Sequence, residues 1–344
     1  MLTPAGMSKT SATWKVLGGV GAVLVGRSLL RRHRKLDLRG KVVVVTGGSR
    51  GLGLVLAREL VARGASVAIG ARDAAELERA RMDLSIRGGT VHAGVLDVTD
   101  RDSVGRFIAE VQDEVGPIDI LINNAGVIQV GPLARIALED FDRAIATHMY
   151  GPLYATMAVL PSMRSRRAGR IVNIASIGGK VAVPHLAPYS ASKFGLVGMS
   201  TAMRQELIAD GIYVTTVCPG LMRTGSQRHA QLRGNHEAEY AWFGVSASLP
   251  GTSMNAERAA HQIIEAMVHG DAELTLSIPA RAAALLAGLA PNLVAEIGGV
   301  IARLMPSAAH TDRTMKEGKD AENPLAPSLL TRLGDLAAAR NNEV

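Results

Sequence analysis

Tyr189 and Lys193 stand four residues apart, and Ser176 precedes the tyrosine by thirteen residues. Residues i and i+4 of a helix share one face, so a helix here would point the phenol and the ammonium into one pocket. A fixed cation favours phenolate and lowers the pKa of a tyrosine, which is ordinarily about 10. Such a tyrosine can exchange a proton with an alcohol or carbonyl oxygen near neutral pH. Alone, this spacing is more typical of a solvated helix face, so its company in the sequence matters.

A strand, a glycine-rich turn and a helix follow one another after Lys41. The β-branched run 42–45 predicts a buried parallel strand, and residues 54–60 have a helical pattern. The turn between them reads Thr46-Gly47-Gly48-Ser49-Arg50-Gly51-Leu52-Gly53. Glycine lets backbone N–H groups approach a pyrophosphate, which the helix N-terminus also attracts. The order predicts the first unit of a dinucleotide-binding fold, the alternative being a plain turn.

The second predicted strand, 66–70, bears on which nucleotide this turn would hold. An NAD site commonly has an acidic residue just past the strand to hold the ribose 2′-hydroxyl. Here Arg72 comes first, ahead of Asp73, and Arg50 lies in the glycine turn. Two guanidiniums suit a 2′-phosphate, which arginine binds bidentately. NADP(H) is therefore the expected coenzyme, with NAD(H) as the alternative if Arg72 is an ordinary surface charge.

Six stretches, correctly ordered, resemble the short-chain dehydrogenase/reductase (SDR) family over roughly residues 38–278. They are the turn 46–53, Asp97 in Leu96-Asp97-Val98-Thr99, Asn123-Asn124-Ala125-Gly126, Ser176, the pair Tyr189 and Lys193, and Cys218-Pro219-Gly220 with Thr224. The resemblance implies an oxidoreductase that moves a hydride between a nicotinamide coenzyme and a carbonyl/alcohol pair.

The resemblance also implies roles for individual residues. Ser176 would polarise the substrate oxygen, Tyr189 would transfer the proton, and Lys193 would lower the pKa of Tyr189 and hold the nicotinamide ribose. The coenzyme contacts that it implies are Thr46, Gly47, Ser49, Arg50, Gly51, Leu52, Gly53, Arg72, Asp97, Val98, Asn124, Ala125, Gly126, Tyr189, Lys193, Pro219, Gly220 and Thr224.

One position, His148, departs from the family pattern. The family carries asparagine there, where it helps to hold a water that connects the lysine to solvent. Histidine donates and accepts hydrogen bonds and titrates near neutrality, so His148 is a candidate catalytic residue. We expect retained activity with a changed pH profile; a tolerated helix residue is the alternative.

Composition excludes several classes of function. The one cysteine, Cys218, forbids an internal disulfide and fits a reducing compartment. With scattered histidines and that single cysteine, no metal-ligand cluster is expected. The net charge is +7, yet no aromatic-basic stripe or nucleic-acid motif accompanies it, so no nucleic-acid partner is expected.

Residues 1–37 are an apolar and basic segment ahead of the predicted catalytic domain, 38–279. As a helix, the apolar stretch 16–30 would reach about 22 Å, short of the roughly 30 Å hydrocarbon core. Three interpretations of residues 14–35 stay open: a short signal anchor, an interfacial helix whose basic run 31–35 is drawn to anionic lipid, or a leader packed on the protein itself. A cytoplasmic catalytic domain is expected, attached in the first two cases to the cytoplasmic face of a membrane.

Strand and helix signals alternate through the predicted catalytic domain. The expected strands are 42–45, 66–70, 90–95, 117–122, 170–174, 212–217 and 273–278. This alternation predicts an α/β fold, a doubly wound parallel sheet (Rossmann fold) whose site lies outside the carboxyl ends of the strands. A long helix, 138–163, should bend at Gly151-Pro152 because proline cannot continue the hydrogen-bond ladder.

Two segments beyond the core carry weaker signals. The family resemblance implies that residues 221–255 form a substrate lid, and long loops of this kind are commonly functional; the alternative is a disordered insertion. The region 280–344 begins with an apolar stretch divided by Pro291, which predicts two helices too short to span a bilayer. We expect them to pack within the chain or in a homo-oligomer, a dimer or tetramer, rather than on a membrane. A mobile tail, 311–327, and a short helix near 328–340 should follow.

Two classes of function remain. The first is NADP(H)-dependent reduction of a small apolar carbonyl compound, or oxidation of the matching alcohol, by a Ser-Tyr-Lys mechanism; a ketoacyl-thioester reductase is a narrower form of it. The second is a catalytically weakened NADP-binding scaffold or redox sensor attached to a membrane, which only His148 favours. Nothing in the residues names the substrate or the direction of reaction.

Overall fold

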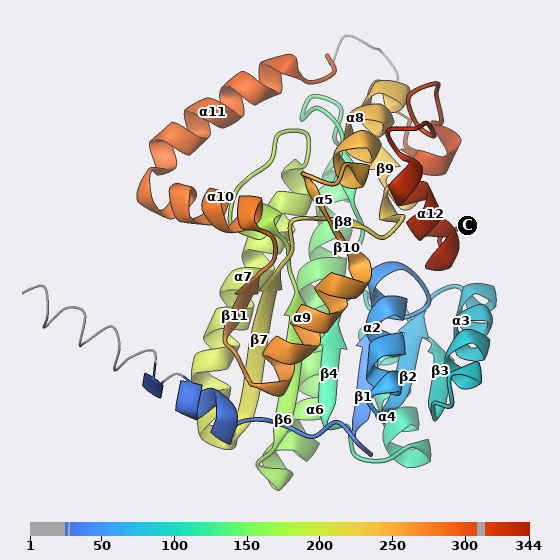
Figure 1. Cartoon of the computed structure of the whole chain (residues 1–344), viewed down its shortest axis with the longest axis vertical. Helices are drawn as coiled ribbons and strands as arrows, with labels where there is room; N and C mark the ends of the chain where they lie inside the picture. The colour runs from blue at the N-terminus through green and yellow to red at the C-terminus, as the bar shows by residue number, and fades with distance from the viewer. Residues whose placement is uncertain (1–24, 27, 308–313) are drawn as a thin grey trace, which may run out of the picture.

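Seven parallel strands form the central sheet, in the order β11-β7-β6-β4-β1-β2-β3. The computed structural model describes residues 25, 26, 28–307 and 314–344 (Figure 1). The strands are β1 (Val42–Thr46), β2 (Ser66–Ala71), β3 (Val91–Val95), β4 (Ile120–Asn123), β6 (Gly169–Ile174), β7 (Ile212–Cys218) and β11 (Glu273–Thr275). The doubly wound sheet is confirmed. The last strand is shorter than predicted, since Ile278 already begins a helix.

Helices cover both faces of the sheet (Figure 1). One layer holds α2 (Gly51–Ala62), α3 (Ala74–Ile86) and α9 (Ala256–Val268), and the other holds α4 (Arg101–Glu114), α6 (Gly151–Arg166) and α7 (Ala187–Leu207). Successive side chains of a strand point to opposite faces. Val43 and Val45 of β1 therefore pack in the first layer and Val42 and Val44 in the second, which explains the continuous apolar run.

The long helix predicted over residues 138–163 is interrupted. It consists of α5 (Leu138–Ile145), a π-helix (Ala146–Tyr150) and α6. Pro152 stands at the start of α6, directly after the π turn, and its missing N–H breaks the hydrogen-bond ladder there. The predicted break at Gly151-Pro152 is thus present as a π turn that carries His148, and a bend there stays a prediction.

The segment predicted as a lid is ordered. Its elements are β8 (Leu221–Arg223), a 3-10 helix (Ser226–His229), β9 (Gln231–Leu232), α8 (His236–Ser248) and β10 (Ser253–Asn255). β9 lies between β5 (Gln129–Val130) and β12 (Lys316–Glu317) in a small sheet, and β10 pairs with β8. The C-terminal chain thus adds a strand to the lid.

The mobile tail expected over residues 311–327 is a wrong prediction for residues 314–327. β12 pairs with β9, and Ala321 and Ala326 are buried in the same apolar cluster as Phe243 of the lid. Residues 311–313 lie outside the described chain. The expected short helix is present as α12 (Arg332–Arg340), beside α8 (Figure 1).

Two further helices, α10 (Ile278–Leu289) and α11 (Pro291–Leu304), stand apart from the sheet (Figure 1). Leu289 and Leu304 are largely exposed. Within the described residues, no helix has both the length and the apolar character that a membrane crossing requires.

The apolar N-terminal stretch lies mostly outside the described residues, but the basic run after it is partly held by the protein. Arg31 pairs with Asp271 at 3.0 Å, and Arg170 donates a hydrogen bond of 2.7 Å to the carbonyl of Arg34. The backbone N–H of Leu36 donates to the carbonyl of Val268. These contacts favour packing on the protein's own surface for this part of the leader.

Candidate active site

Ser176, Tyr189 and Lys193 converge at the carboxyl end of the sheet. Ser176 follows β6, and α7 presents Tyr189 and Lys193 on one face, as their spacing predicts. A Cβ on Gly178 would lie 3.2 Å from the Tyr189 ring and 3.5 Å from Ser176 Oγ, so both side chains flank this glycine. The ammonium of Lys193 lies 5.7 Å from the centre of the Tyr189 ring.

Burial dominates the protonation of this group. It raises the pKa of Tyr189, against the opposing effect of a hydrogen bond with the Ser176 side chain. It lowers the pKa of Lys193 to about 7, and Lys193 Nζ donates to the carbonyl of Ile174 at 2.8 Å. The expectation that Lys193 makes Tyr189 acidic is therefore not met by the protein groups alone, because burial raises the pKa of Tyr189 more than the hydrogen bond with Ser176 lowers it.

His148 is completely buried, and both of its ring nitrogens have protein partners. Nε2 accepts a hydrogen bond of 3.1 Å from the N–H of Val127, so the ring proton belongs on Nδ1, which lies 2.7 Å from Ser192 Oγ. Burial and the nearby charge of Lys193 hold the pKa of His148 well below its ordinary value of 6.5. The expectation that His148 titrates near neutrality is therefore wrong.

The same histidine connects two elements around the tyrosine. Ser192 Oγ, which accepts from His148 Nδ1, donates to the carbonyl of Tyr189 at 2.9 Å. The imidazole and the Tyr189 ring meet edge to face, with centroids 5.4 Å apart and planes at 88°. A chain of hydrogen bonds thus runs from Val127, after β4, to the first turn of α7, and His148 supports the position of Tyr189.

The glycine turn is fixed by the fourth strand. Thr46 Oγ1 accepts from the N–H groups of Asn124 and Ala125, and Asn124 Nδ2 donates to the carbonyls of Thr46 and Gly47. Gly47 has φ of +65°, and a Cβ there would lie 2.8 Å from Ala125 Cα. The predicted residues of the two motifs therefore lie together, and glycine is required at position 47.

The helix that follows the turn is built to receive an anion. Its N-cap, Arg50, provides no capping side chain, and its first turn contains no acidic residue. The first N–H groups of a helix have no intrahelical acceptor, and the helix dipole makes this end positive. Arg72, near the end of β2, is exposed. These groups fit the phosphates of a dinucleotide.

Ser49 and Arg50 share a partner that sequence reasoning missed. Glu76, in the first turn of α3, accepts from Ser49 Oγ at 3.1 Å and from Arg50 Nη1 at 2.8 Å. Arg50 also meets His229 of the lid. The sequence does carry a signal here, since Glu76 follows Asp73, the N-cap of α3, by three residues. This spacing indicates the start of a helix, but it does not indicate that Glu76 contacts Ser49 and Arg50 of the glycine turn.

The remaining predicted contacts border the same end of the sheet. The carboxylate of Asp97 accepts from the N–H and hydroxyl of Thr99, and buried Val98 packs where Gly151 leaves room. Gly126 lies beside His148, whose Nε2 would be 3.2 Å from a Cβ there. The predicted residues after β7 are also fixed by the protein. The carbonyl of Pro219 accepts from the N–H of Ile177, the N–H of Gly220 donates to the carbonyl of Leu276, and Thr224 is buried.

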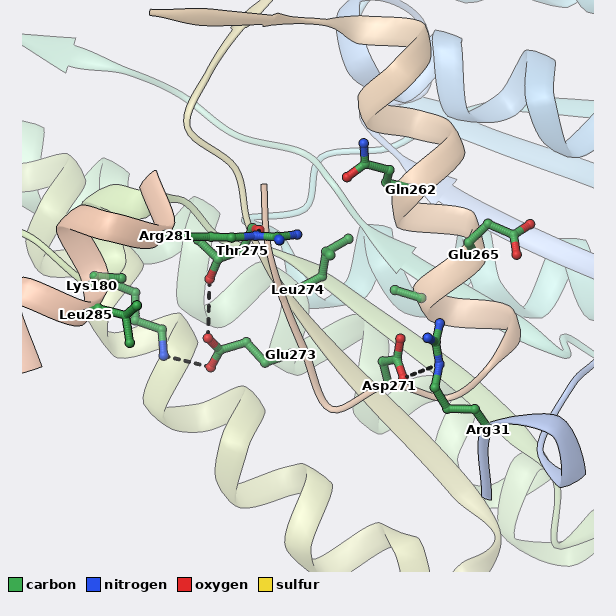
Figure 2. A pocket seen from close by; sticks show the side chains of 12 residues that line it. Arg31, Lys180, Gln262, Glu265, Asp271, Glu273, Leu274, Thr275, Arg281 and Leu285 are labelled. Carbon is green, nitrogen blue, oxygen red and sulfur yellow. Dashed lines mark hydrogen bonds and ion pairs between the residues drawn. The ribbon is translucent and has the colours of Figure 1, made fainter. Parts of the chain in front are cut away.

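A cavity of about 660 Å³ lies elsewhere, along the outer edge of β11 (Figure 2). Glu273 pairs there with Lys180 at 2.7 Å, and Arg31 pairs with Asp271. Neither Ser176, Tyr189 nor Lys193 lines this cavity. It is thus separate from the candidate site.

One group among the described residues could hold a metal ion, although none was expected. It consists of His92 and the exposed Glu110 and Glu114, whose ligand atoms lie within 4.8 Å of one another. Nε2 of His92 lies 3.2 Å from the Glu110 carboxylate, and Nδ1 lies 3.2 Å from the Glu114 carboxylate. Exposed acidic groups of this kind are common without a metal, and this one lies outside the candidate site.

Comparison with known proteins decides the family. A family model described as short chain dehydrogenase matches residues 41–233. A dehydrogenase/reductase SDR family protein 7-like from Anopheles gambiae is 35% identical over 280 residues, which are 79% of this chain and 87% of the relative. The chain belongs to the short-chain dehydrogenase family. It is accordingly an oxidoreductase, as the arrangement of Ser176, Tyr189 and Lys193 suggests.

Other members of the family are similar over the Rossmann core. Ketoacyl reductase HetN from Nostoc sp. is 41% identical over 183 residues, 53% of this chain and 64% of the relative. A crystal structure of an actinorhodin polyketide ketoreductase variant with NADPH matches with a TM-score of 0.62 and 32% identity. It covers 69% of this chain and 95% of the ketoreductase.

Proposed function

We propose that this short-chain dehydrogenase reduces a carbonyl group on an apolar substrate with NADPH, or oxidises the matching alcohol. The observation that carries the proposal is the meeting of Ser176, Tyr189 and Lys193 beside the glycine turn. The sheet orders β1 between β2 and β4, so this is the switch point at which open α/β sheets bind ligands. A bound nicotinamide coenzyme would supply the hydride.

We propose a role for each of these side chains. Ser176 Oγ accepts from the N–H of Gly178 at 3.0 Å, and its hydroxyl, which hydrogen-bonds with Tyr189, can turn its proton to a substrate oxygen. Tyr189, with its raised pKa, holds its proton at neutral pH and can give it to the developing alkoxide. The Ile174 carbonyl holds Lys193 Nζ in place. From there the ammonium stabilises the negative charge that forms on the phenol oxygen of Tyr189 when the proton leaves.

NADP(H) is proposed ahead of NAD(H). Exposed Arg72 lies where an NAD site would have its carboxylate, and Arg50 is in the turn. The related ketoreductase was crystallised with NADPH, which supports the same choice.

An apolar substrate is proposed from the lining of the lid. Tyr189 packs against the buried apolar cluster of the lid, as do Ile128, Val183 and Trp242, and all four are only partly buried. Trp242 is fixed through its indole N–H, which donates to fully buried Glu239 at 2.6 Å. A rigid apolar wall beside the phenol suits a carbonyl attached to hydrocarbon. The ketoacyl reductases among the relatives make acyl thioesters a second candidate class.

The test is loss of NADPH absorbance with a panel of retinals, steroid ketones, long-chain ketones and acyl thioesters. We expect turnover with at least one apolar carbonyl and none with a charged sugar acid of similar size. Tight NADPH binding without turnover of any carbonyl would instead support the scaffold or redox-sensor alternative.

We also propose that residues 14–35 attach the protein to the cytoplasmic face of a membrane and that it forms a homo-oligomer through α10 and α11. Exposed Arg32, His33 and Lys35 support the first idea, and exposed leucines support the second. Co-sedimentation with anionic vesicles and light scattering test them. A protein that stays in the supernatant with the vesicles would exclude membrane attachment. A monomer at micromolar concentration would exclude the homo-oligomer.

A further inference from the structure

The last residues of the chain lie on the glycine turn. The N–H of Gly51 donates to the carbonyl of Asn341 at 2.9 Å, and Asn342 Nδ2 donates to the carbonyl of Ser49 at 2.9 Å. α12 leads the chain there, and Figure 1 shows its end above α2. About 290 residues separate the two partners in sequence.

Glu343 carries a carboxylate to the start of α2. The residue is only 5% exposed, and its Oε2 lies 3.5 Å from Arg50 Nε and 3.2 Å from His229 Nε2. A Cβ on Gly51 would lie 2.5 Å from Glu343 Oε1. Within the described chain Oε2 has ion-pair neighbours but no hydrogen bond of good geometry. A buried carboxylate oxygen held this loosely is easier to displace than a fully bonded one.

The position is that of an anion at a helix N-terminus beside an arginine. Arg50 already has Glu76 as a partner at 2.8 Å, so its charge is compensated without Glu343. A phosphate that approaches Arg50 meets the negative charge of Glu343 as well as the guanidinium. Like charges at such distances repel, whereas either anion alone is attracted.

We propose that Glu343 is a specificity-determining residue that competes with the 2′-phosphate of the coenzyme for Arg50. The proposal rests on the proposed function, because it needs the coenzyme to bind at this turn. The 2′-phosphate gains Arg50 only after Glu343 gives it up, so the C-terminus lowers affinity for NADPH more than affinity for NADH. Coenzyme preference is thereby set by a residue outside the Rossmann core.

The test compares Glu343→Gln with the wild type by fluorescence titration of NADPH and NADH. We expect Glu343→Gln to bind NADPH about tenfold more tightly, the effect of one strong charge-assisted contact, and to gain clearly less affinity for NADH, which shares the pyrophosphate near Glu343 but lacks the 2′-phosphate. Glu322→Gln is the matched control, since Glu322 pairs with Arg228 at 2.8 Å in the same C-terminal segment, and it should change neither affinity.

A second measurement uses the unaltered chain, so it does not depend on the variant's folding. Carboxypeptidase should release Val344 and Glu343 faster in the presence of 2′,5′-ADP, which carries the 2′-phosphate, than with 5′-AMP. Equal NADPH affinity in Glu343→Gln and the wild type, or protection of the C-terminus by 2′,5′-ADP, would overturn the proposal. A wild type that binds neither NADPH nor NADH would instead refute the proposed function.

Discussion

Two regions of the candidate site are held together in different ways: the catalytic corner, which is the surroundings of Tyr189 and Lys193, and the surroundings of Arg50 in the glycine turn. Around Tyr189, the supporting polar groups are bonded to backbone and hydroxyl groups of the protein: Lys193 to the Ile174 carbonyl, and His148 to Val127 and Ser192. Around Arg50, the partners are carboxylates of Glu76 and Glu343, which are chemically similar to the phosphate expected there.

The first kind of contact positions a catalytic group, and the second kind selects a coenzyme. Backbone and buried hydroxyl partners fix the proton donor, Tyr189, before any substrate arrives, which keeps the reorganisation needed for catalysis small. Exchangeable carboxylate partners make binding a competition, so their number and placement can tune which coenzyme is preferred. Changes in the first region should therefore alter rate or stability, and changes in the second should alter coenzyme affinity.

The largest effect is expected for Tyr189→Phe. Removing the proton donor should lower kcat by about 10³-fold, within the range for a lost general acid, while NADPH affinity stays within about threefold. Steady-state kinetics and a coenzyme titration measure the two quantities. Residual activity within tenfold of the wild type would show that another group supplies the proton.

Lys193→Met tests how strongly burial opposes charge in the catalytic corner. The pKa of Lys193 is about 7 in the folded chain and ordinarily 10.5, so between these values the unfolded chain binds more protons. Burying the charged ammonium of Lys193 costs folding free energy. This cost is therefore fully present below pH 7 and disappears as the pH rises to about 10.5. Relative to Lys193→Met, the unfolding free energy of the coenzyme-free wild type should rise by a few kcal/mol over this window, on the order of the pKa shift.

Urea unfolding at pH 7, 8, 9 and 10 measures this difference. Other groups that titrate in the window cancel between the two proteins, which differ at one residue. A difference that stays flat with pH would mean that Lys193 keeps its ordinary pKa.

Arg72→Ala tests the phosphate end. Arg72 is exposed, so its contact with a 2′-phosphate is partly screened by water, and we expect NADPH affinity to fall about tenfold. NADH affinity should not change, because NADH lacks this phosphate. An equal loss for both coenzymes would place Arg72 at another part of the nucleotide, and raised salt should shrink a true phosphate effect.

His148→Asn should have the smallest effect on catalysis. His148 is neutral at the pH of activity, so the pH–rate profile above pH 6 should keep its shape. Asparagine is shorter and reaches only one of the two partners, so the unfolding free energy should fall by about 1–2 kcal/mol. Ser192→Ala, which breaks the same chain of hydrogen bonds, is the control. A pH profile that shifts in His148→Asn alone would restore the hypothesis that His148 is a catalytic residue that titrates.

Much of the fold could be predicted because its signals are local. The valines of β1, the glycines of the turn and the spacing of Tyr189 and Lys193 each specify short-range structure that the sheet then assembles. The site residues named from these motifs do gather at one end of the sheet. The effect of burial on Lys193 and His148 could not be foreseen, since desolvation depends on every neighbour in space.

The C-terminal segment was hidden for a different reason. Asn341, Asn342 and Glu343 show no hydrophobic period, and their partners at Ser49 to Gly51 lie at the opposite end of the sequence. Polar residues near a chain end are typical of a mobile tail. Only the packing of α12 against α8 reveals that they reach the coenzyme turn.

The most direct test of hydride transfer uses NADPH that carries deuterium at both C4 positions of the nicotinamide, with the best carbonyl substrate from the panel. Mass spectrometry of the product should find one deuterium on the carbinol carbon with the wild type and essentially none formed by Tyr189→Phe in the same time. If the wild type binds the labelled coenzyme but forms no deuterated alcohol from any carbonyl offered, the chain is not the reductase described above.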